Sequence, residues 1–537
     1  MEATLGNTLQ LWGEARYALD HAIQNYLDRT VALQSDLQSY SHSSGSTPVQ
    51  DTLPKAWLDD IQVPANYSKL ARAQAHLSRI RNSFLSINTL PLEILLRIFR
   101  FSAFHSFHTR YNTPLPNPFQ KDDRNDLVVL THICTHWRTV LLNTQTFWSR
   151  FELNTKENLG IAGERARAYL DRAPDVPLSF YIEEHPMHEL CSVEDSPITE
   201  HLGARFDRLA RMALINLRDP HTARDIILFW MRNGKPGVLR TLTIRMDTDY
   251  WYDEVVDTRS LPVTRERADL FLAPIRVLYL NRWRFDWDSP VYHNLVVLRI
   301  GGFSEEFSPQ IHEILAILSA CPQLHTLQLF TMSIRPSDLR GFEPVYLTEL
   351  DNLSLIDVSS KSSSLLLPTI SPRSQNLTFR VTLPQTDEEI GFDSIRLFLS
   401  HNNVTRLFIQ EWVDVESYNL SWYLSATPNL HTLIIDVNEA PGDRCLSGLT
   451  RLDESKGIHV PLCPQLHTLY LLEGTFSTTV VQQVVETHHI RKLRFLGCDI
   501  KPSEDELQCW LKPFVEDVRF EERVYSAESV DWYHLMD

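Results

Sequence analysis

The residue types that could do chemistry do not group into a catalytic or metal-binding set. Metal-ligating types cluster at 184–189 (Glu-His-Pro-Met-His-Glu) and in His-x-Cys-x-His at 132–136. The first cluster lacks zinc spacing, and the second would spread around a helix instead of lining one face. The sequence contains no P-loop, dinucleotide-binding, nucleophile-elbow or zinc-protease motif. We therefore expect no catalytic residue, no metal site and no cofactor, and a chain that is not an enzyme.

Three histidines repeat because the sequence around them repeats. His325, His431 and His467 share one position in Cys-Pro-Gln-Leu-His-Thr-Leu-Gln-Leu, Thr-Pro-Asn-Leu-His-Thr-Leu-Ile-Ile and Cys-Pro-Gln-Leu-His-Thr-Leu-Tyr-Leu. The shared pattern, apolar-x-x-apolar-x-apolar, is typical of leucine-rich repeats. Weaker copies begin at Leu209, Leu239, Ile275, Leu295, Leu350, Leu377, Val404, Ile490 and Val515. The pattern predicts a repeat array over residues 205–537.

Segments with helical spacing lie between the repeats. One runs over 311–318 and stops at Cys321-Pro322; others lie at 420–424 and 480–485. A proline just past a helix ends it, so each helix is expected to turn into the next short strand. Parallel strands need such crossovers. We predict an α/β fold in which N-terminal helices and a three-helix motif precede an irregular leucine-rich-repeat solenoid with a parallel, concave sheet.

The concave face is the expected binding surface of such a solenoid, because residues that alternate with the leucines point to it. The alternative for each residue is an ordinary solvated sheet face. The candidate target-binding residues are Gln328, Phe330, Arg406, Phe408, Gln410, Asp436, Tyr470 and Arg494.

Residues 1–87 carry two runs of seven-residue apolar spacing, separated by a flexible linker at 41–54. The first run is Leu5, Trp12, Leu19, Tyr26, Leu33 and Tyr40. The second comprises Val63, Leu70, Leu77 and Phe84. Such spacing places one stripe on each helix. The two helices could form a hairpin, or a coiled coil through which the chain self-associates.

A strongly apolar helix is expected from Leu90-Pro91 onward. Its sequence is Leu-Pro-Leu-Glu-Ile-Leu-Leu-Arg-Ile-Phe, and Ile94 and Ile98 adjoin the main apolar side, which includes Leu95 and Phe99. Proline suits a helix start, and Glu93 suits its positive end. Because the helix is apolar over more than half its circumference, it must be buried by its own domain and by something else.

Two further motifs follow in order. Ile133-Cys134-Thr135-His136-Trp137-Arg138 lies in a second helical segment, and Phe147-Trp148 comes after it. Together with the Leu90-Pro91 helix, they resemble the signature of the F-box family over 88–150. The wider layout, with a connecting segment at 151–204, resembles fungal F-box proteins with leucine-rich repeats. The stretch 103–126, which contains three prolines, is read as a long loop inserted between the first two F-box helices.

The resemblance implies a substrate-recognition subunit of an SCF-type cullin–RING ubiquitin ligase, acting in ubiquitin-dependent protein degradation. The F-box would dock on a Skp-type adaptor and the repeats would bind an unknown protein target. The residues implied to face or support the adaptor are Leu90, Pro91, Ile94, Leu95, Ile98, Ile133 and Trp137. Two alternatives stay open: these residues only form a local helical core, or the chain is a non-ligase scaffold whose F-box-like helices cap the solenoid.

Composition favours an intracellular protein that meets other proteins. Hydrophobic residues make up 43% and charged residues 22% of the chain, as in chains that fold. The net charge of −17 argues against nucleic-acid binding. The seven scattered cysteines and the absence of a signal peptide or long apolar run predict a cytoplasmic or nuclear protein that does not enter a membrane.

Overall fold

The computed structural model describes residues 2–43, 71–73, 75, 82, 85–111, 126–154, 159–183, 205–246, 256–257, 263–337, 343–383, 389–410, 420–437, 442–453 and 458–521. The chain divides into two compact units, Met1–Leu90 and Pro91–Asp537. The boundary falls inside the predicted 88–150 motif, and the residues after it belong to the same unit as the predicted repeats at 205–537.

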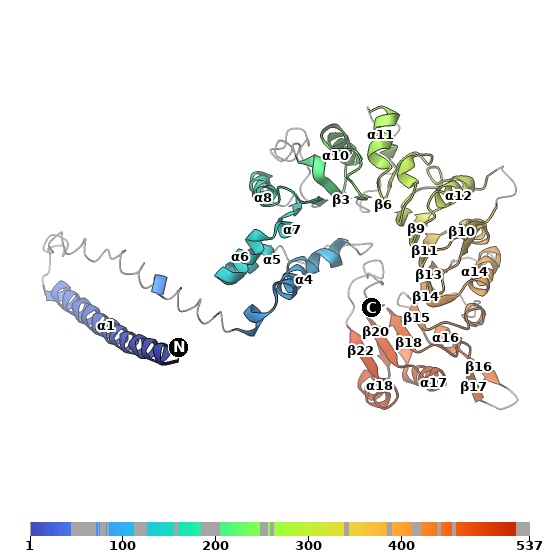
Figure 1. Cartoon of the computed structure of the whole chain (residues 1–537). Helices are drawn as coiled ribbons and strands as arrows, with labels where there is room; N and C mark the ends of the chain where they lie inside the picture. Colours follow the sequence, from blue (N-terminus) through green and yellow to red (C-terminus); the bar gives the residue numbers. More distant parts are fainter. Residues whose placement is uncertain are drawn as a thin grey trace. The chain divides into compact units, whose positions relative to one another are not determined.

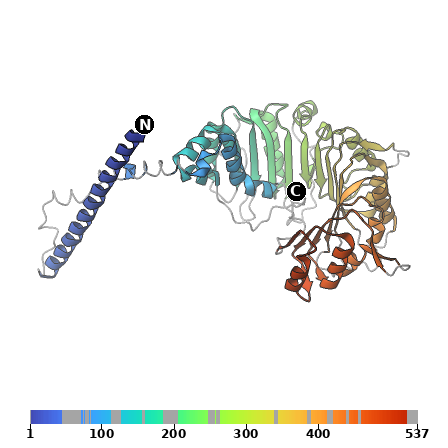
Figure 2. The same cartoon turned by 60° about the horizontal axis from the view of Figure 1, so that its bottom comes forward.

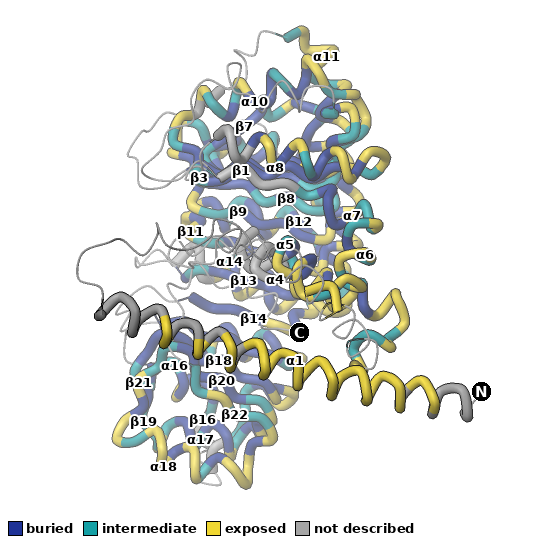
Figure 3. The backbone as a smooth tube through the Cα atoms, turned by 90° about the vertical axis from the view of Figure 1, so that its left-hand side faces the viewer, coloured by how far each residue is buried: buried dark blue, intermediate teal, exposed yellow. Residues whose placement is uncertain are grey.

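The first unit contains one long helix, α1 (Glu2–Ser43), and a short 3-10 helix, η2 (Ser86–Thr89). The apolar stripe of α1 faces solvent where it is described: Trp12 and Leu19 are each 45% exposed and Tyr26 is 60% exposed. Figure 3 shows this exposure along the helix. Most of the predicted second helix, from Val63 to Ile87, lies outside the described residues. The hairpin and the self-associating coiled coil both stay predictions.

The second unit contains a large parallel sheet. Its fourteen strands, in spatial order, are β1 (Arg150–Asn154), β2 (Leu178–Glu183), β3 (Leu209–Leu217), β4 (Thr241–Met246), β6 (Val277–Asn281), β8 (Val297–Gly301), β9 (Thr326–Met332), β11 (Asn352–Val358), β13 (Leu377–Thr382), β14 (Val404–Gln410), β15 (Thr432–Asp436), β18 (Thr468–Leu472), β20 (Lys492–Leu496) and β22 (Asp517–Glu521). Spatial order follows sequence order, so each strand pairs with the next one along the chain. The mixed α/β class and the parallel sheet are therefore as predicted.

Helices connect many of these strands and cover one side of the sheet. They are α8 (Leu159–Arg172), α10 (Pro220–Asn233), α11 (Arg265–Leu272), α12 (Ile311–Ser319), α13 (Ser360–Leu366), α14 (Glu389–His401), α15 (Ser421–Leu424), α16 (Asp443–Ser447), α17 (Thr478–His488) and α18 (Glu504–Leu511). The strands follow an arc with the helices on its outer side (Figures 1 and 2). We call the other side of the sheet the open face.

The main core lies between the sheet and these helices. Leu327 and Leu329 of β9 are fully buried there, and so are Leu433 of β15 and Leu469 of β18. The helix α12, predicted at 311–318, buries Ile311, Ile314 and Leu318 against the same layer. The leucine spacing thus produces the layer that the sequence predicts, because alternate strand residues face the helices.

Four two-stranded sheets flank the large one. They pair β5 (Val256–Asp257) with β7 (Trp283–Arg284), β10 (Val345–Leu347) with β12 (Ile370–Pro372), β16 (Thr450–Asp453) with β17 (Ile458–Pro461), and β19 (Thr475–Ser477) with β21 (Asp499–Lys501). Only the β16–β17 pair is antiparallel among these described pairs.

The sheet begins before the first predicted repeat. Strands β1 and β2 lie partly or wholly within 151–204, which the sequence assigned to a connection. Their alternating residues, as in Leu178-Ser-Phe-Tyr-Ile-Glu, form strands without the leucine-repeat spacing that marks the later ones. The repeat pattern therefore found every strand of the large sheet from β3 onward and missed these two, as well as the strands of the small sheets.

Among the described residues, four helices precede the sheet in the second unit. They are α4 (Leu92–Tyr111), α5 (Asp126–Ile133), α6 (Thr135–Asn143) and α7 (Gln145–Trp148). The loop predicted at 103–126 was wrong over 103–111, where α4 continues. That part contains no glycine or proline, and the first helix breaker is Pro114. Residues 112–125 of the predicted loop lie outside the described residues.

Among the helices that the structure describes, none combines the length and the apolar character needed to cross a membrane.

Candidate functional site

Pro91 starts α4 from just outside the helix. Its carbonyl oxygen accepts hydrogen bonds from the backbone N–H groups of Ile94, at 3.1 Å, and Leu95, at 3.0 Å. Leu95 and Phe99, four residues apart, point inward and are 1% and 0% exposed. This inner side fixes how α4 is rotated in the unit, and hence which residues face outward.

Cys134 divides the second motif into two helices. It is the N-cap of α6, and its Sγ accepts a hydrogen bond from the Trp137 N–H at 3.5 Å. The Trp137 ring, which is half-buried, packs on Phe99 with the ring centroids 4.7 Å apart. The motif residues Cys134 and Trp137 therefore shape the junction of α4, α5 and α6. Cys134 acts as a cap here, with no metal cluster around it in the described part of the chain.

Phe147 and Trp148 join these helices to the sheet. Trp148 is 3% exposed, and its Nε1–H donates a hydrogen bond to the Leu141 carbonyl at 2.8 Å. Its ring meets Tyr169 of α8 edge-on at 5.0 Å, and the Arg172 guanidinium lies 5.0 Å from its centroid. The aromatic pair thus anchors the helices beside β1 and α8.

The outward side of α4 and α5 carries an exposed apolar surface. We define the α4–α5 stripe as Ile94, Ile98, Phe101, Val129 and Ile133, which are 46%, 38%, 67%, 53% and 54% exposed. At 3.6 residues per turn, the three α4 residues fall within an arc of about 60°. The two α5 residues, four apart, share one side of their helix. The stripe therefore comprises one exposed apolar row on α4 and one on α5, two helices that contact each other.

The predicted adaptor residues fall into distinct environments. Ile94, Ile98 and Ile133 lie on the stripe, and Pro91 is also exposed. Leu95 is buried and Trp137 half-buried, so neither belongs to the exposed stripe. Leu90 is half-buried and belongs to the first unit.

Sequence reasoning missed Phe101 and Val129, which belong to the stripe. Phe101 lies seven residues after Ile94, and Val129 lies four residues before Ile133. Helical spacing from residues already chosen would have found both.

The second candidate surface is the open face. Strand register aligns Phe408, Ile434, Tyr470 and Arg494 in one row across β14, β15, β18 and β20. Gln410 and Asp436 lie in the row above, and Arg406 lies in the row below. Gln328 and Phe330 occupy the same side of β9, further along the sheet. All eight predicted target-binding residues thus share one face.

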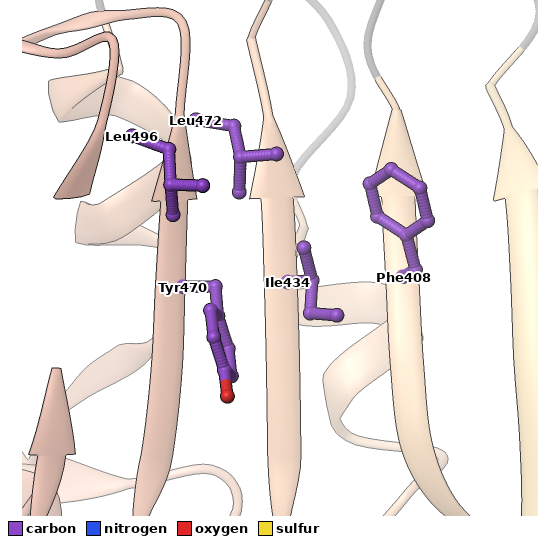
Figure 4. Close-up of a cluster of buried hydrophobic side chains, with 5 residues drawn as sticks. All are labelled: Phe408, Ile434, Tyr470, Leu472 and Leu496. Atoms are coloured by element: carbon purple, nitrogen blue, oxygen red, sulfur yellow. The ribbon is translucent and has the colours of Figure 1, made fainter. Parts of the chain in front are cut away.

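Most of these residues are not accessible to a partner. Phe408, Ile434, Tyr470, Leu472 and Leu496 form a cluster that is only 1–8% exposed. Figure 4 shows their side chains together in front of the strands. Gln328, Gln410, Asp436 and Arg494 are also buried, whereas Arg406 is exposed and Phe330 half-buried. Side chains of neighbouring strands contribute to this burial, since Arg380 lies against Phe408 and Lys492 against Tyr470.

The charged residues of the buried rows already have partners. The Arg380 guanidinium lies 4.3 Å from the centroid of the Phe408 ring. Arg494 donates two hydrogen bonds to the Asp517 carboxylate, one of them at 2.8 Å. These bonds hold the pKa of Asp517 below its ordinary value. Phe408 and Arg494 therefore act in packing and pairing within the sheet.

The repeat cysteines have structural roles as well. Cys321 donates its S–H to the Tyr292 carbonyl at 2.8 Å, and burial raises its pKa to about 11. Burial also raises the pKa of Cys463, to about 12. A thiol that stays protonated is a poor nucleophile. Cys321 lies just before β9 and Cys463 just before β18, so both pack where the chain turns into a strand.

No family model matches the sequence, and no curated protein matches it. The α4–α5 stripe and the open face of the sheet are the two candidate interaction surfaces of the described residues.

Proposed function

We propose that the chain is a substrate-recognition subunit of an SCF-type cullin–RING ubiquitin ligase, as its F-box-like motifs imply. In this proposal the α4–α5 stripe docks on a Skp-type adaptor, and the sheet is a leucine-rich-repeat solenoid that binds the target protein. The protein would act in the cytoplasm or nucleus and would have no catalytic residues of its own.

The observation that carries the proposal is the exposure of the α4–α5 stripe. The inner apolar side of α4 is buried, but its outer apolar side is in contact with water. Exposing apolar surface to water is unfavourable, so a partner that covers the outer side would stabilise it. Contiguous exposed patches of this kind mark interaction sites. The stripe also contains three of the residues that the F-box resemblance assigns to the adaptor, Ile94, Ile98 and Ile133. Covering a half-exposed isoleucine stabilises a complex by on the order of 1 kcal/mol.

The scaffold alternative is favoured by the packing of Trp148. Its contacts with Tyr169 and Arg172 attach α7 to α8, as a cap on the sheet would require. A cap accounts for the inner residues Leu95, Phe99 and Trp148. It gives no role to the outward residues of the stripe, so we favour the adaptor.

A capture experiment with a purified Skp-type adaptor tests the proposal. Ile94→Asp and Ile98→Asp together should lower adaptor affinity about a hundredfold or more, because each places a charge in an apolar interface. Leu397→Asp is the matched control, since Leu397 is a 56% exposed apolar residue on α14. It should bind like the wild type.

The scaffold alternative makes the opposite forecast. A wild-type chain that is folded by circular dichroism and still fails to capture the adaptor would favour the cap. So would capture that the stripe variant retains in full.

A further inference from the structure

Polar residues gather near the start of four neighbouring strands, and three of them, Thr405, Thr432 and Thr468, are buried. We define the β14–β20 rim as Thr405, Arg406, His431, Thr432, His467, Thr468, Arg491 and Lys492. Backbone N–H groups of His431, His467 and Arg491 donate to Thr405, His431 and His467 in turn, at 2.8, 3.2 and 2.8 Å. Arg406, Thr432, Thr468 and Lys492 form the next level in register. The rim is therefore two adjacent levels across β14, β15, β18 and β20.

The rim is positively charged in an acidic protein. It holds three cations, two histidines and three threonines but no carboxylate, whereas the whole chain has a net charge of −17. Arg406, His467 and Arg491 are exposed, and His431 and Lys492 are half-buried. Such a local excess attracts carboxylates.

The carboxylates nearest along the sheet lie on or just before β22. The Asp517 carboxylate accepts hydrogen bonds from Arg494 and lies 3.6 Å from Arg519 Nε. Asp517 is also in register with Lys492, which helps to lower its pKa, and the exposed Glu516 precedes it at the level of Arg491. Asp517 is thus bonded mainly to Arg494, and three strands separate both carboxylates from Arg406, on β14 at the other end of the rim.

The two histidines of the rim are held in a fixed arrangement. The His431 and His467 rings stack with centroids 5.6 Å apart and an interplanar angle of 20°. Nε2 of His431 lies 2.8 Å from the Gln465 Oε1, and Nδ1 of His467 lies 2.9 Å from the Thr468 Oγ1. Partial burial, His431 and Arg491 together lower the pKa of His467. A carboxylate placed beside this pair would favour protonation of His467 and so bind more tightly as pH falls.

We propose that the β14–β20 rim binds an acidic segment of the target protein. Four strands about 4.8 Å apart span about 14 Å, which four to five extended residues cross. A segment with two or more Asp or Glu residues at that spacing would reach Arg406 at one end and Arg491 and Lys492 at the other. That the acidic segment belongs to a ligase target rests on the proposed function. Binding of an acidic segment to the rim does not depend on it.

Fluorescence anisotropy with a labelled Glu-rich peptide tests the rim, with the Gln version of the same peptide as the ligand control. The full chain should bind the Glu peptide and not the Gln peptide. Binding should weaken between about 0.05 M and 0.3 M salt, because these charges are at the surface. The affinity for the Glu peptide should also rise from pH 7.5 to pH 6, because protonation of one histidine adds a positive charge to the rim.

Variants assign the binding to the rim. Arg406→Gln and Arg491→Gln should each lower the affinity about tenfold, the loss expected for one charge-assisted contact. His467→Asn should flatten the pH dependence. Lys512→Gln makes the same charge change at an exposed residue after α18 and should leave the affinity unchanged.

Equal binding of the two peptides, or an equal loss in Lys512→Gln and Arg406→Gln, would overturn the rim as the site. Adaptor capture is measured on the same proteins, so the two proposals fail separately. A chain that captures the adaptor and ignores the Glu peptide contradicts only the rim. A chain that binds the peptide through the rim without capturing the adaptor contradicts only the proposed function.

Discussion

Two apolar surfaces of the second unit have opposite exposures. The α4–α5 stripe is 38–67% exposed, whereas the Phe408–Leu496 cluster on the open face is 1–8% exposed. Both contain large aliphatic and aromatic residues outside the main core between the sheet and its helices. An apolar surface outside the main core is therefore a candidate interaction site only when it is exposed in the folded chain.

Replacing Phe408 should cause the largest loss of stability, and it tests whether the cluster on the open face is buried. Phe408→Ala leaves a cavity beside Arg380 and should destabilise the sheet by about 3–5 kcal/mol. The shift of the urea midpoint, followed by tryptophan fluorescence, measures it. If Phe408 were instead a solvent-facing contact for a target, the midpoint would barely move.

The inner side of α4 should respond with a smaller loss. Phe99→Leu keeps an apolar residue but loses part of the contact with Trp137, so it should cost about 1–2 kcal/mol. Thermal unfolding followed by circular dichroism detects this loss. An unchanged melting temperature would mean that Phe99 is less tightly packed than its full burial implies.

The stripe itself should tolerate truncation. Ile94→Ala removes a side chain that is already 46% exposed and should change the free energy of unfolding by about 0.5 kcal/mol. The same urea titration compares it with Phe408→Ala. A loss as large as that of Phe408→Ala would mean that the stripe belongs to the core.

The smallest expected effect is a pH dependence of the free energy of unfolding that comes from His488, on a helix that packs against the sheet. His488 is 3% exposed, and burial lowers its pKa below the ordinary 6.5. The unfolded state therefore binds more protons, so stability should fall as pH drops below about 6.5. His488→Gln should reduce the slope of stability against pH in urea titrations between pH 7 and pH 5. An unchanged slope would assign the pH dependence to other groups.

Much of the fold follows from local spacing. Leu327 and Leu329 sit two apart in a repeated pattern, and that spacing alone decides which strand face meets the helices. Strands β1 and β2 alternate apolar and polar residues but lack the leucine-repeat spacing. Their membership of the same sheet depends on pairing with other strands, which a short segment of sequence does not reveal.

The candidate site was partly predictable for the same reason. Helical spacing separates Leu95 and Phe99 from Ile94 and Ile98, but only the structure shows that the first pair is buried and the second pair exposed. The burial of Tyr470 and Phe408 was not predictable, because alternation assigns a residue to a face but not to an accessible surface.

Hydrogen–deuterium exchange of the chain, with and without a purified Skp-type adaptor, tests the central claim most directly. The α4–α5 stripe as docking surface predicts new protection in peptides covering 92–103 and 126–134, and little change in β14, β15 and β18. Protection confined to the sheet, or none at saturating adaptor, would contradict the account.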